Sequence, residues 1–202
     1  MNPEILNTIS SFSVNKIADD RKEILWPFIN YVQDKINNNE TIRLNFICTH
    51  NSRRSHLSQI WAQTMAYHFG IKNIFCYSGG TEATAMFPKV LETLKNQGFH
   101  IQKLSENNNP VYMVKYAQNE APIICFSKEY NHEFNPKNKF IAILTCDSAD
   151  QGCPTVFGAE ARFPIKYNDP KVYDNTVQMD IKYMERSLEI GQELWWVFQS
   201  IK

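Results

Sequence analysis

The chemistry in this sequence centres on residues 48–55, which read Cys-Thr-His-Asn-Ser-Arg-Arg-Ser. Cys48 follows a β-prone stretch, and Arg54 stands six positions later, where a helix is expected to begin. Backbone N–H groups in such a loop can surround a tetrahedral oxyanion, and the N-terminus of the following helix adds positive potential. Arg54 can bind two oxygens as a fork, and the same field favours the thiolate of Cys48. The spacing therefore predicts a nucleophilic sulfur inside an oxyanion-binding loop.

Each residue of this loop receives a predicted role. The hydroxyl of Ser55 can donate to the Cys48 sulfur, and Asn51 can brace the loop by binding backbone. Phosphate, sulfate or arsenate is the ligand expected here, with no tightly bound cofactor. The expected oxyanion-binding residues are Thr49, His50, Asn51, Ser52, Arg53, Arg54 and Ser55. The alternative is a buried cysteine at a strand end with a surface arginine nearby, but the polar residues between them favour the functional interpretation.

Two further groups could take part in chemistry at Cys48. Asp169 precedes Pro170 after the last expected strand, where a carboxyl group could protonate a leaving oxygen. Taken alone, Asp-Pro is more often a turn. Cys146 and Cys153 bracket a polar, acidic segment that we expect to be exposed and mobile, and a thiol relay needs such a segment. The alternatives are a core thiol at position 146 and an incidental loop cysteine at position 153.

The elements that must position these groups alternate along the chain. Residues 42–47, 71–77, 139–145 and 161–167 are expected as strands, and 55–69, 87–97 and 176–200 as helices. Ser78 to Thr81 is expected as a turn. Such alternation predicts an α/β fold, a central parallel sheet covered by helices on both faces. Residues 1–40 are expected as an N-terminal helical extension, residues 41–202 as one catalytic domain, and about 100–138 as an inserted hairpin or lid.

The composition argues against several classes of partner and site. The formal net charge is zero, so nucleic acid and acidic membranes are not expected as partners. No apolar run could span a bilayer, and the N-terminus does not resemble a signal peptide, so a cytoplasmic location is expected. The five cysteines form no Cys-x-x-Cys pair, which argues against a metal site. Cys76 and Cys125 lie in apolar stretches and are expected to be core thiols.

The loop CTHNSRRS resembles the phosphate loop of the low-molecular-weight protein tyrosine phosphatase superfamily, which includes thioredoxin-coupled arsenate reductases. The resemblance covers about residues 42–99 and 139–200, and it departs from the family pattern at His50 and Arg53. It implies a three-layer sandwich around a four-stranded parallel sheet, with Asp169 as general acid. The segment from Cys146 to Pro154 resembles the redox segment of the reductases.

The resemblance leaves three functions open. The preferred one is reduction of arsenate through Cys48, Cys146 and Cys153, with a thioredoxin-like reductant as partner. The second is a phosphatase that hydrolyses phosphotyrosine or aryl phosphates through a phosphocysteine. The third is an oxyanion- or phosphoprotein-binding module without turnover, against which the joint presence of Cys48, Arg54 and Asp169 argues.

Overall fold

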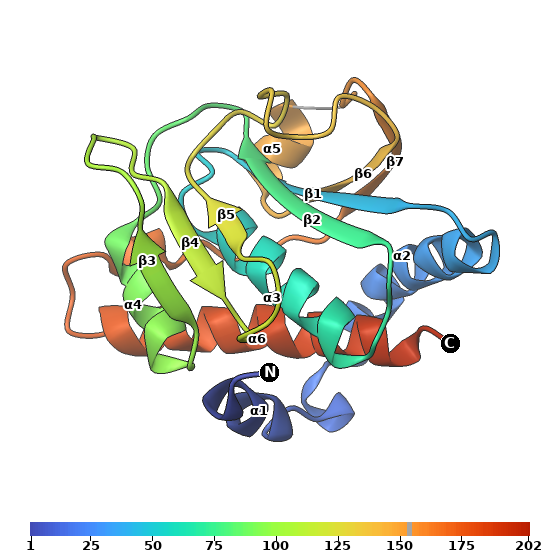
Figure 1. Cartoon of the computed structure of the whole chain (residues 1–202), viewed down its shortest axis with the longest axis horizontal. Coiled ribbons are helices and arrows are strands. Elements are labelled where there is room, and N and C mark those ends of the chain that lie inside the picture. Colours follow the sequence, from blue (N-terminus) through green and yellow to red (C-terminus); the bar gives the residue numbers. More distant parts are fainter. Residues whose placement is uncertain (153–154) are drawn as a thin grey trace.

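A four-stranded parallel sheet forms the centre of the molecule (Figure 1). The computed structural model describes residues 1–152 and 155–202. The strand order is β2-β1-β6-β7. The bounds are Ile42–Cys48 for β1, Ile74–Gly80 for β2, Phe140–Leu144 for β6 and Ala159–Pro164 for β7. All pairings are parallel, so the carboxyl ends of the strands lie at one edge, where Cys48 ends β1.

Burial of both sheet faces explains why the central strand β6 is continuously apolar. In β6, Ile141 and Ile143 join the larger core, whereas Phe140, Ala142 and Leu144 join a second cluster on the opposite face. Alternation of side chains along a strand produces this division, and a strand buried on both faces needs apolar residues at every position.

Helices cover both faces, which confirms the predicted three-layer fold. On the larger core lie α2 (Asp19–Asn37), α3 (Arg54–His68) and the long α6 (Met179–Ser200). Helix α4 (Pro88–Asn96) packs beside α6. The short α5 (Asp147–Gly152) covers the other face against β1 and β6 (Figure 1).

The N-terminal segment is helical and shares the main core. It comprises α1 (Pro3–Ser10), the short 3-10 helix η1 (Val14–Lys16) and α2. Ile5 of α1 and Phe28 of α2 are fully buried in the cluster that also holds Trp61 of α3. The extension is therefore packed against the sheet's helical layer.

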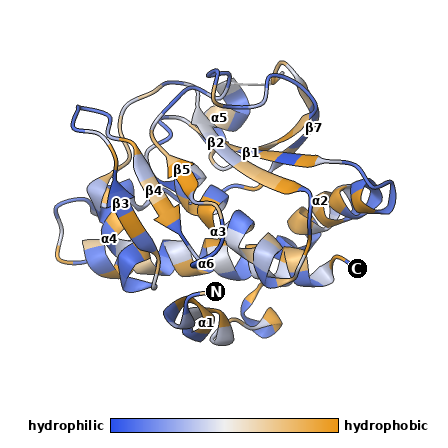
Figure 2. Cartoon of the chain, viewed as in Figure 1, coloured by the Kyte–Doolittle hydropathy of each residue, from blue (hydrophilic) through white to orange (hydrophobic). Residues whose placement is uncertain are grey.

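The inserted region forms a second, antiparallel sheet. Its strands are β3 (His100–Lys103), β4 (Tyr112–Lys115) and β5 (Ile123–Cys125), in that spatial order. Figure 2 shows apolar residues in β4 and β5 and a hydrophilic loop between β3 and β4. After β5 the chain returns to the main sheet, where Glu129 bridges to Gly80.

Several predicted boundaries were wrong. Ser78, Gly79 and Gly80 continue β2 and pair with β1 as far as Cys48, although their composition is typical of a turn. Helix α6 begins at Met179 and not at residue 176, and Val177, which precedes the helix, is 99 % exposed. Among the described residues, no helix combines the length and apolarity needed to cross a membrane.

Candidate active site

The predicted loop connects β1 directly to α3. Cys48 is the last residue of β1, and Arg54 is the first residue of α3. Asn51 adopts a left-handed conformation with φ of 43°, which asparagine tolerates better than most residues. This turn lets the backbone double back between the strand and the helix.

Outward hydrogen bonds fix the orientation of the loop's peptide groups. The carbonyls of Cys48, Thr49 and Ser52 accept from the backbone amides of Thr81, Glu82 and Phe87 at 3.0–3.1 Å. The carbonyl of His50 accepts from the hydroxyls of Ser127 and Thr84. Within residues 1–152 and 155–202, none of the backbone N–H groups of residues 49–53 donates to a backbone carbonyl. Because the carbonyl groups are bound on the outside of the loop, the N–H groups can point to its inside and bind an anion there, as in an anion nest.

A chain of hydrogen bonds leads to the sulfur of Cys48. The backbone N–H of Lys128 donates to Asn51 Oδ1 at 3.0 Å, and Asn51 Nδ2 donates to Ser55 Oγ at 2.8 Å. Ser55 Oγ lies 3.0 Å from Cys48 Sγ. Because Ser55 already accepts from Asn51, its own proton is available to donate to the sulfur, and a hydrogen bond of this kind favours a thiolate. Asn51 and Ser55 are both fully buried.

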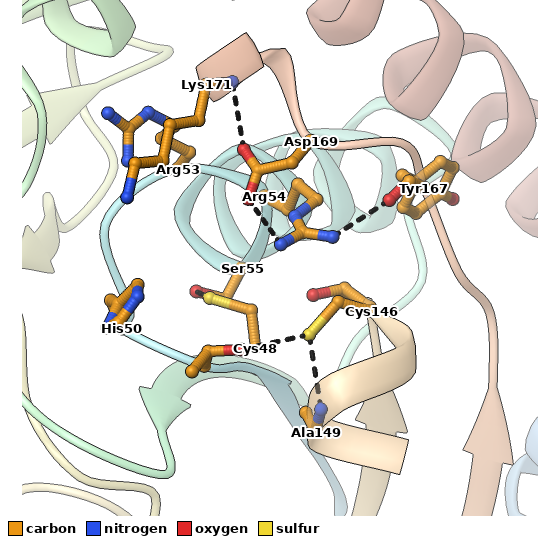
Figure 3. Close-up of polar contacts among 12 residues, drawn as sticks. Cys48, His50, Arg53, Arg54, Ser55, Cys146, Ala149, Tyr167, Asp169 and Lys171 are labelled. Carbon is orange, nitrogen blue, oxygen red and sulfur yellow. Dashed lines mark hydrogen bonds and ion pairs between the residues drawn. The ribbon is translucent and has the colours of Figure 1, made fainter. Parts of the chain in front are cut away.

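Arg54 and Asp169 meet above this loop (Figure 3). Arg54 Nη2 lies 2.5 Å from Asp169 Oδ2, and Arg54 Nη1 donates to the carbonyl of Tyr167 at 3.0 Å. The other carboxylate oxygen of Asp169 accepts from the backbone N–H of Lys171 and caps the 3-10 helix η2 (Pro170–Tyr173). The predicted acid and the predicted anion-binding arginine are therefore in direct contact.

Two side chains of the loop are turned away from Cys48. The guanidinium of Arg53 binds Tyr183 and Asp174 and stacks over the ring of Phe87. His50 Nδ1 lies 2.7 Å from the carboxylate of Glu82 at the surface. These two residues can serve an anion through their backbone N–H groups, whereas their side chains lie outside the loop's interior.

Cys146 lies beside the loop. Its sulfur is 3.5 Å from Thr49 Oγ1 and accepts from the backbone N–H of Ala149 at 3.4 Å (Figure 3). Cys48 and Cys146 belong to the same buried cluster and are 4 % and 3 % exposed. The structure thus brings together Cys48, Arg54, Ser55, Asp169 and Cys146 from three segments of the chain.

The segment after Cys146 differs from the mobile loop that we expected. Residues Asp147–Gly152 form α5, and ion pairs with Arg162 and Lys166 tether the side chain of Asp150. Cys153, the predicted third thiol, lies outside the described residues. Burial raises the pKa of Cys125 to about 12, and burial also raises that of Cys76, so both remain protonated thiols in the core.

Three contributors to the site were missed in the sequence. Gly80 lies so close to the loop that an added Cβ would be 2.5 Å from the carbonyl oxygen of Thr49. Asp174 and Tyr183 hold Arg53. The paired glycines after an apolar strand were the available signal for close approach, whereas nothing local to Asp174 or Tyr183 indicated their partner. Among the described residues, no group of three or more His, Cys, Asp or Glu side chains could hold a metal.

Comparisons with known proteins show which sequences and folds this chain resembles. Residues 43–117 match the family model described as low molecular weight phosphotyrosine protein phosphatase. An arsenate reductase of Staphylococcus aureus is 29 % identical over 116 residues, which are 55 % of this chain and 65 % of that protein.

Solved structures share the fold at lower identity. A low-molecular-weight phosphotyrosine phosphatase from Vibrio cholerae superposes with a TM-score of 0.51 at 13 % identity, covering 77 % of this chain and 93 % of that one. A low-molecular-weight protein tyrosine phosphatase from T. tengcongensis has a TM-score of 0.51 at 15 % identity, covering 76 % and 95 %. The resemblance predicted from the sequence is therefore confirmed: this chain has the fold of the low-molecular-weight phosphotyrosine protein phosphatases, and its residues 43–117 match the model of that family.

Proposed function

We propose that this chain is a cysteine-thiolate enzyme that acts on a tetrahedral oxyanion, and that its reaction is the thiol-dependent reduction of arsenate to arsenite. The observation that carries the choice of reaction is the position of Cys146, whose sulfur lies 3.5 Å from the hydroxyl of the residue that follows Cys48. A phosphatase needs one thiolate, whereas a reductase needs a second thiol that can reach the first. The slight exposure of Cys48, 4 %, suits a substrate that presents a small tetrahedral group.

The first step is attack on arsenic. The Cys48 thiolate, stabilised by Ser55, forms a bond to arsenic(V) while the loop amides and Arg54 hold the oxygens. An oxygen of arsenate leaves as water, with a proton from Asp169. The pairing of Asp169 with Arg54 offers a way to time that proton transfer. When an anion takes over the guanidinium, Asp169 loses its cationic partner and gains an anionic neighbour, and both changes favour its protonated form.

The next steps move two electrons to arsenic. The thiolate of Cys146 attacks Cys48 Sγ, the sulfur–arsenic bond breaks, and its electron pair remains on arsenic, so that arsenite leaves and a Cys48–Cys146 disulfide forms. Cys153 then attacks the sulfur of Cys146 and releases Cys48 as thiolate. A thioredoxin-like dithiol reduces the remaining disulfide and is itself oxidised.

Hydrolysis of phosphate monoesters is the second candidate. The arrangement of Cys48, Arg54 and Asp169 favours it, because these three groups suffice to form and hydrolyse a phosphocysteine. Asp169 would act first as acid and then as base. In this reaction neither Cys146 nor Cys153 has a chemical role.

One experiment separates these functions. Wild type, Cys48→Ser, Cys146→Ser and Cys153→Ser are assayed with arsenate plus thioredoxin and with an aryl phosphate. For the reductase we expect Cys48→Ser and Cys146→Ser to release no arsenite, and Cys153→Ser to release one equivalent and then stop.

The contrary outcomes are equally specific. Multiple turnover of arsenate by Cys153→Ser would exclude the proposed relay through Cys48, Cys146 and Cys153. Hydrolysis of the aryl phosphate without any reduction of arsenate would identify the protein as a phosphatase. Binding of phosphate with no turnover of either substrate would indicate that the protein is an oxyanion-binding module.

A further inference from the structure

The turn that carries Asp169 is held at both ends by adjacent arginines. The 3-10 helix η2 is one turn long, with Asp169 as the residue before it and Asp174 as the residue after it. Arg54 binds Asp169, and Arg53 binds Asp174. Both arginines stand at the start of α3, so the oxyanion loop and the acid-bearing turn are joined at two points.

The anchor at Arg53 is buried and fully engaged. Arg53 Nε donates to Tyr183 Oη at 2.6 Å, and Arg53 Nη2 lies 2.5 Å from Asp174 Oδ2. The hydroxyl of Tyr183 donates to the other carboxylate oxygen of Asp174, which closes a three-membered network. The guanidinium carbon also lies 4.0 Å from the ring centroid of Phe87. Tyr183 is fully buried, and the Arg53 side chain is 10 % exposed, so solvent screens these contacts weakly.

Arg54 alone cannot fix Asp169 throughout the reaction. An oxyanion in the loop needs the same guanidinium that Asp169 binds, so the contact between Arg54 and Asp169 weakens when substrate enters. Arg53 faces away from the loop's interior (Figure 3), so an anion in the loop does not compete for the contacts of Arg53 with Tyr183 and Asp174. A second anchor of this kind keeps the carboxyl group within reach of the leaving oxygen.

We propose that Arg53 is a positioning residue for Asp169, which it holds in place through Asp174 and Tyr183 at the far end of η2. The proposal rests on the proposed function, because it assigns Asp169 as the acid, and it applies to both candidate reactions. Arg53 would touch neither substrate nor sulfur with its side chain. Lysine could not replace it, because a single ammonium group lacks the planar fork that spans Tyr183 and Asp174.

The test compares two esters that need the acid to different extents. Phenyl phosphate has a poor leaving group, whereas p-nitrophenyl phosphate has one that departs with little protonation. Arg53→Met should lower kcat/KM for phenyl phosphate by about 10- to 100-fold, which reaches the lower end of the about 10²- to 10⁴-fold that general acid catalysis contributes, and should change kcat/KM for p-nitrophenyl phosphate little. The ratio kcat/KM is compared because it reports the step in which the phenol leaves, whereas kcat also includes the hydrolysis of the phosphocysteine that both esters share. Lys35→Met is the matched control, because Lys35 is also a buried cation with two carboxylate partners, and it should leave both rates unchanged.

A second variant protects the test against misfolding. Arg53→Met leaves Asp174 as a poorly compensated buried charge, which can destabilise the fold. The double variant Arg53→Met with Asp174→Asn removes both charges and keeps an acceptor for Tyr183. We expect it to regain stability but to retain the selective loss on phenyl phosphate. Recovery of the phenyl phosphate rate in the double variant, or equal losses on both esters, would overturn the proposal.

Amide hydrogen exchange gives an answer that does not depend on activity. Segment 167–176 should exchange about 10-fold faster or more in the double variant than in wild type, while β1 and α3 stay protected. Unchanged exchange in this segment would refute the positioning role. A wild type that turns over no substrate would refute the proposed function instead, and the exchange result would still decide whether Arg53 holds the turn.

Discussion

Arg54 and Asp169 lie 2.5 Å apart, joined by an ion pair above the sulfur of Cys48. The arginine is the first residue of α3, directly after the loop that follows β1, and the aspartate comes 115 residues later, after β7. Their contact couples two requirements of the proposed chemistry, because the group that must bind the oxyanion also holds the group that must donate the proton. The Arg54 side chain is 12 % exposed and that of Asp169 is 30 % exposed, so the aspartate remains accessible to solvent and substrate.

Replacement of Arg54 tests whether its planar guanidinium must bind two oxygens of the substrate at once. Arg54→Lys keeps the positive charge but cannot hold two oxygens in one plane. We expect kcat/KM for arsenate and for p-nitrophenyl phosphate to fall about 10²- to 10³-fold, as for loss of an oxyanion donor in other enzymes. Arg21→Lys is the control, because Arg21 makes a two-point contact with Glu193 away from the loop. Wild-type rates in Arg54→Lys would exclude a role for two-point binding by the guanidinium of Arg54.

Replacement of Ser55 tests the hydrogen bond to sulfur. Ser55→Ala removes the only hydroxyl found within 3.0 Å of Cys48 Sγ among the described residues. A hydrogen bond to a charged group contributes about 1.5–3 kcal/mol, so we expect the ratio of thiolate to thiol at Cys48 to fall about 10- to 100-fold. The measurement is the rate of Cys48 alkylation by iodoacetate against pH, whose half-maximum should move to higher pH. Thr64→Ala, which removes a buried hydroxyl from the same helix, should leave that profile unchanged.

The parts of the site that could be predicted are local in sequence. Cys48, the loop and Arg54 occupy consecutive positions between a strand and a helix, and the short-range geometry of that junction follows from residue type. The central strand β6 was predictable because it is apolar on both faces. The strand–helix order then brings the ends of the parallel strands to one edge of the sheet.

The parts that could not be predicted depend on distant partners. Arg53 was expected to bind the anion, but its side chain pairs with Asp174 and Tyr183, which lie 121 and 130 residues away. The Ser-Gly-Gly run has the composition of a turn, and only the packing of the loop against Gly80 explains why it is a strand. The acidic segment after Cys146 is helical, and ion pairs with Arg162 and Lys166 tether its Asp150.

Gly80 is expected to admit no side chain. A Cβ at this position would lie 2.5 Å from the carbonyl oxygen of Thr49 and 2.8 Å from the backbone nitrogen of Asn51. Gly80→Ala must therefore displace the loop, and misplacement of reacting groups by about 1 Å can cost about 10²-fold in rate. We expect a loss of that order in kcat for both candidate substrates, together with a lower melting temperature.

Gly152 is the matched control for Gly80. Among residues 1–152 and 155–202, no atom lies within 4 Å of an added Cβ at Gly152, so Gly152→Ala should hydrolyse p-nitrophenyl phosphate at the wild-type rate. Full activity in Gly80→Ala would show that the loop tolerates a shift at its back wall and that the tight packing is unimportant.

Lys128 predicts an unusual dependence of stability on pH. Its side chain is 1 % exposed, and its ammonium group donates to the carbonyl of Phe126 and lies 4.5 Å from the ring centroid of Phe126. Burial lowers the pKa of Lys128 from 10.5 to about 8, with an opposing influence from Cys125. Between pH 8 and 10.5 the unfolded chain binds more protons at this position than the folded one, so this residue's contribution to stability rises with pH across that window.

Lys128→Met removes the cost of burying that charge. We expect the variant to be more stable than wild type by up to about 3 kcal/mol at pH 7, and the difference to shrink as pH rises above 8. Urea unfolding at pH 7 and at pH 9.5 measures it. Burial lowers the pKa of Lys35, but hydrogen bonds to Glu160 and Glu40 outweigh that effect and raise it, so Lys35→Met should be less stable than wild type at pH 7. A Lys128→Met variant that is less stable than wild type at both pH values would mean that the contacts of the ammonium group with Phe126 outweigh its desolvation.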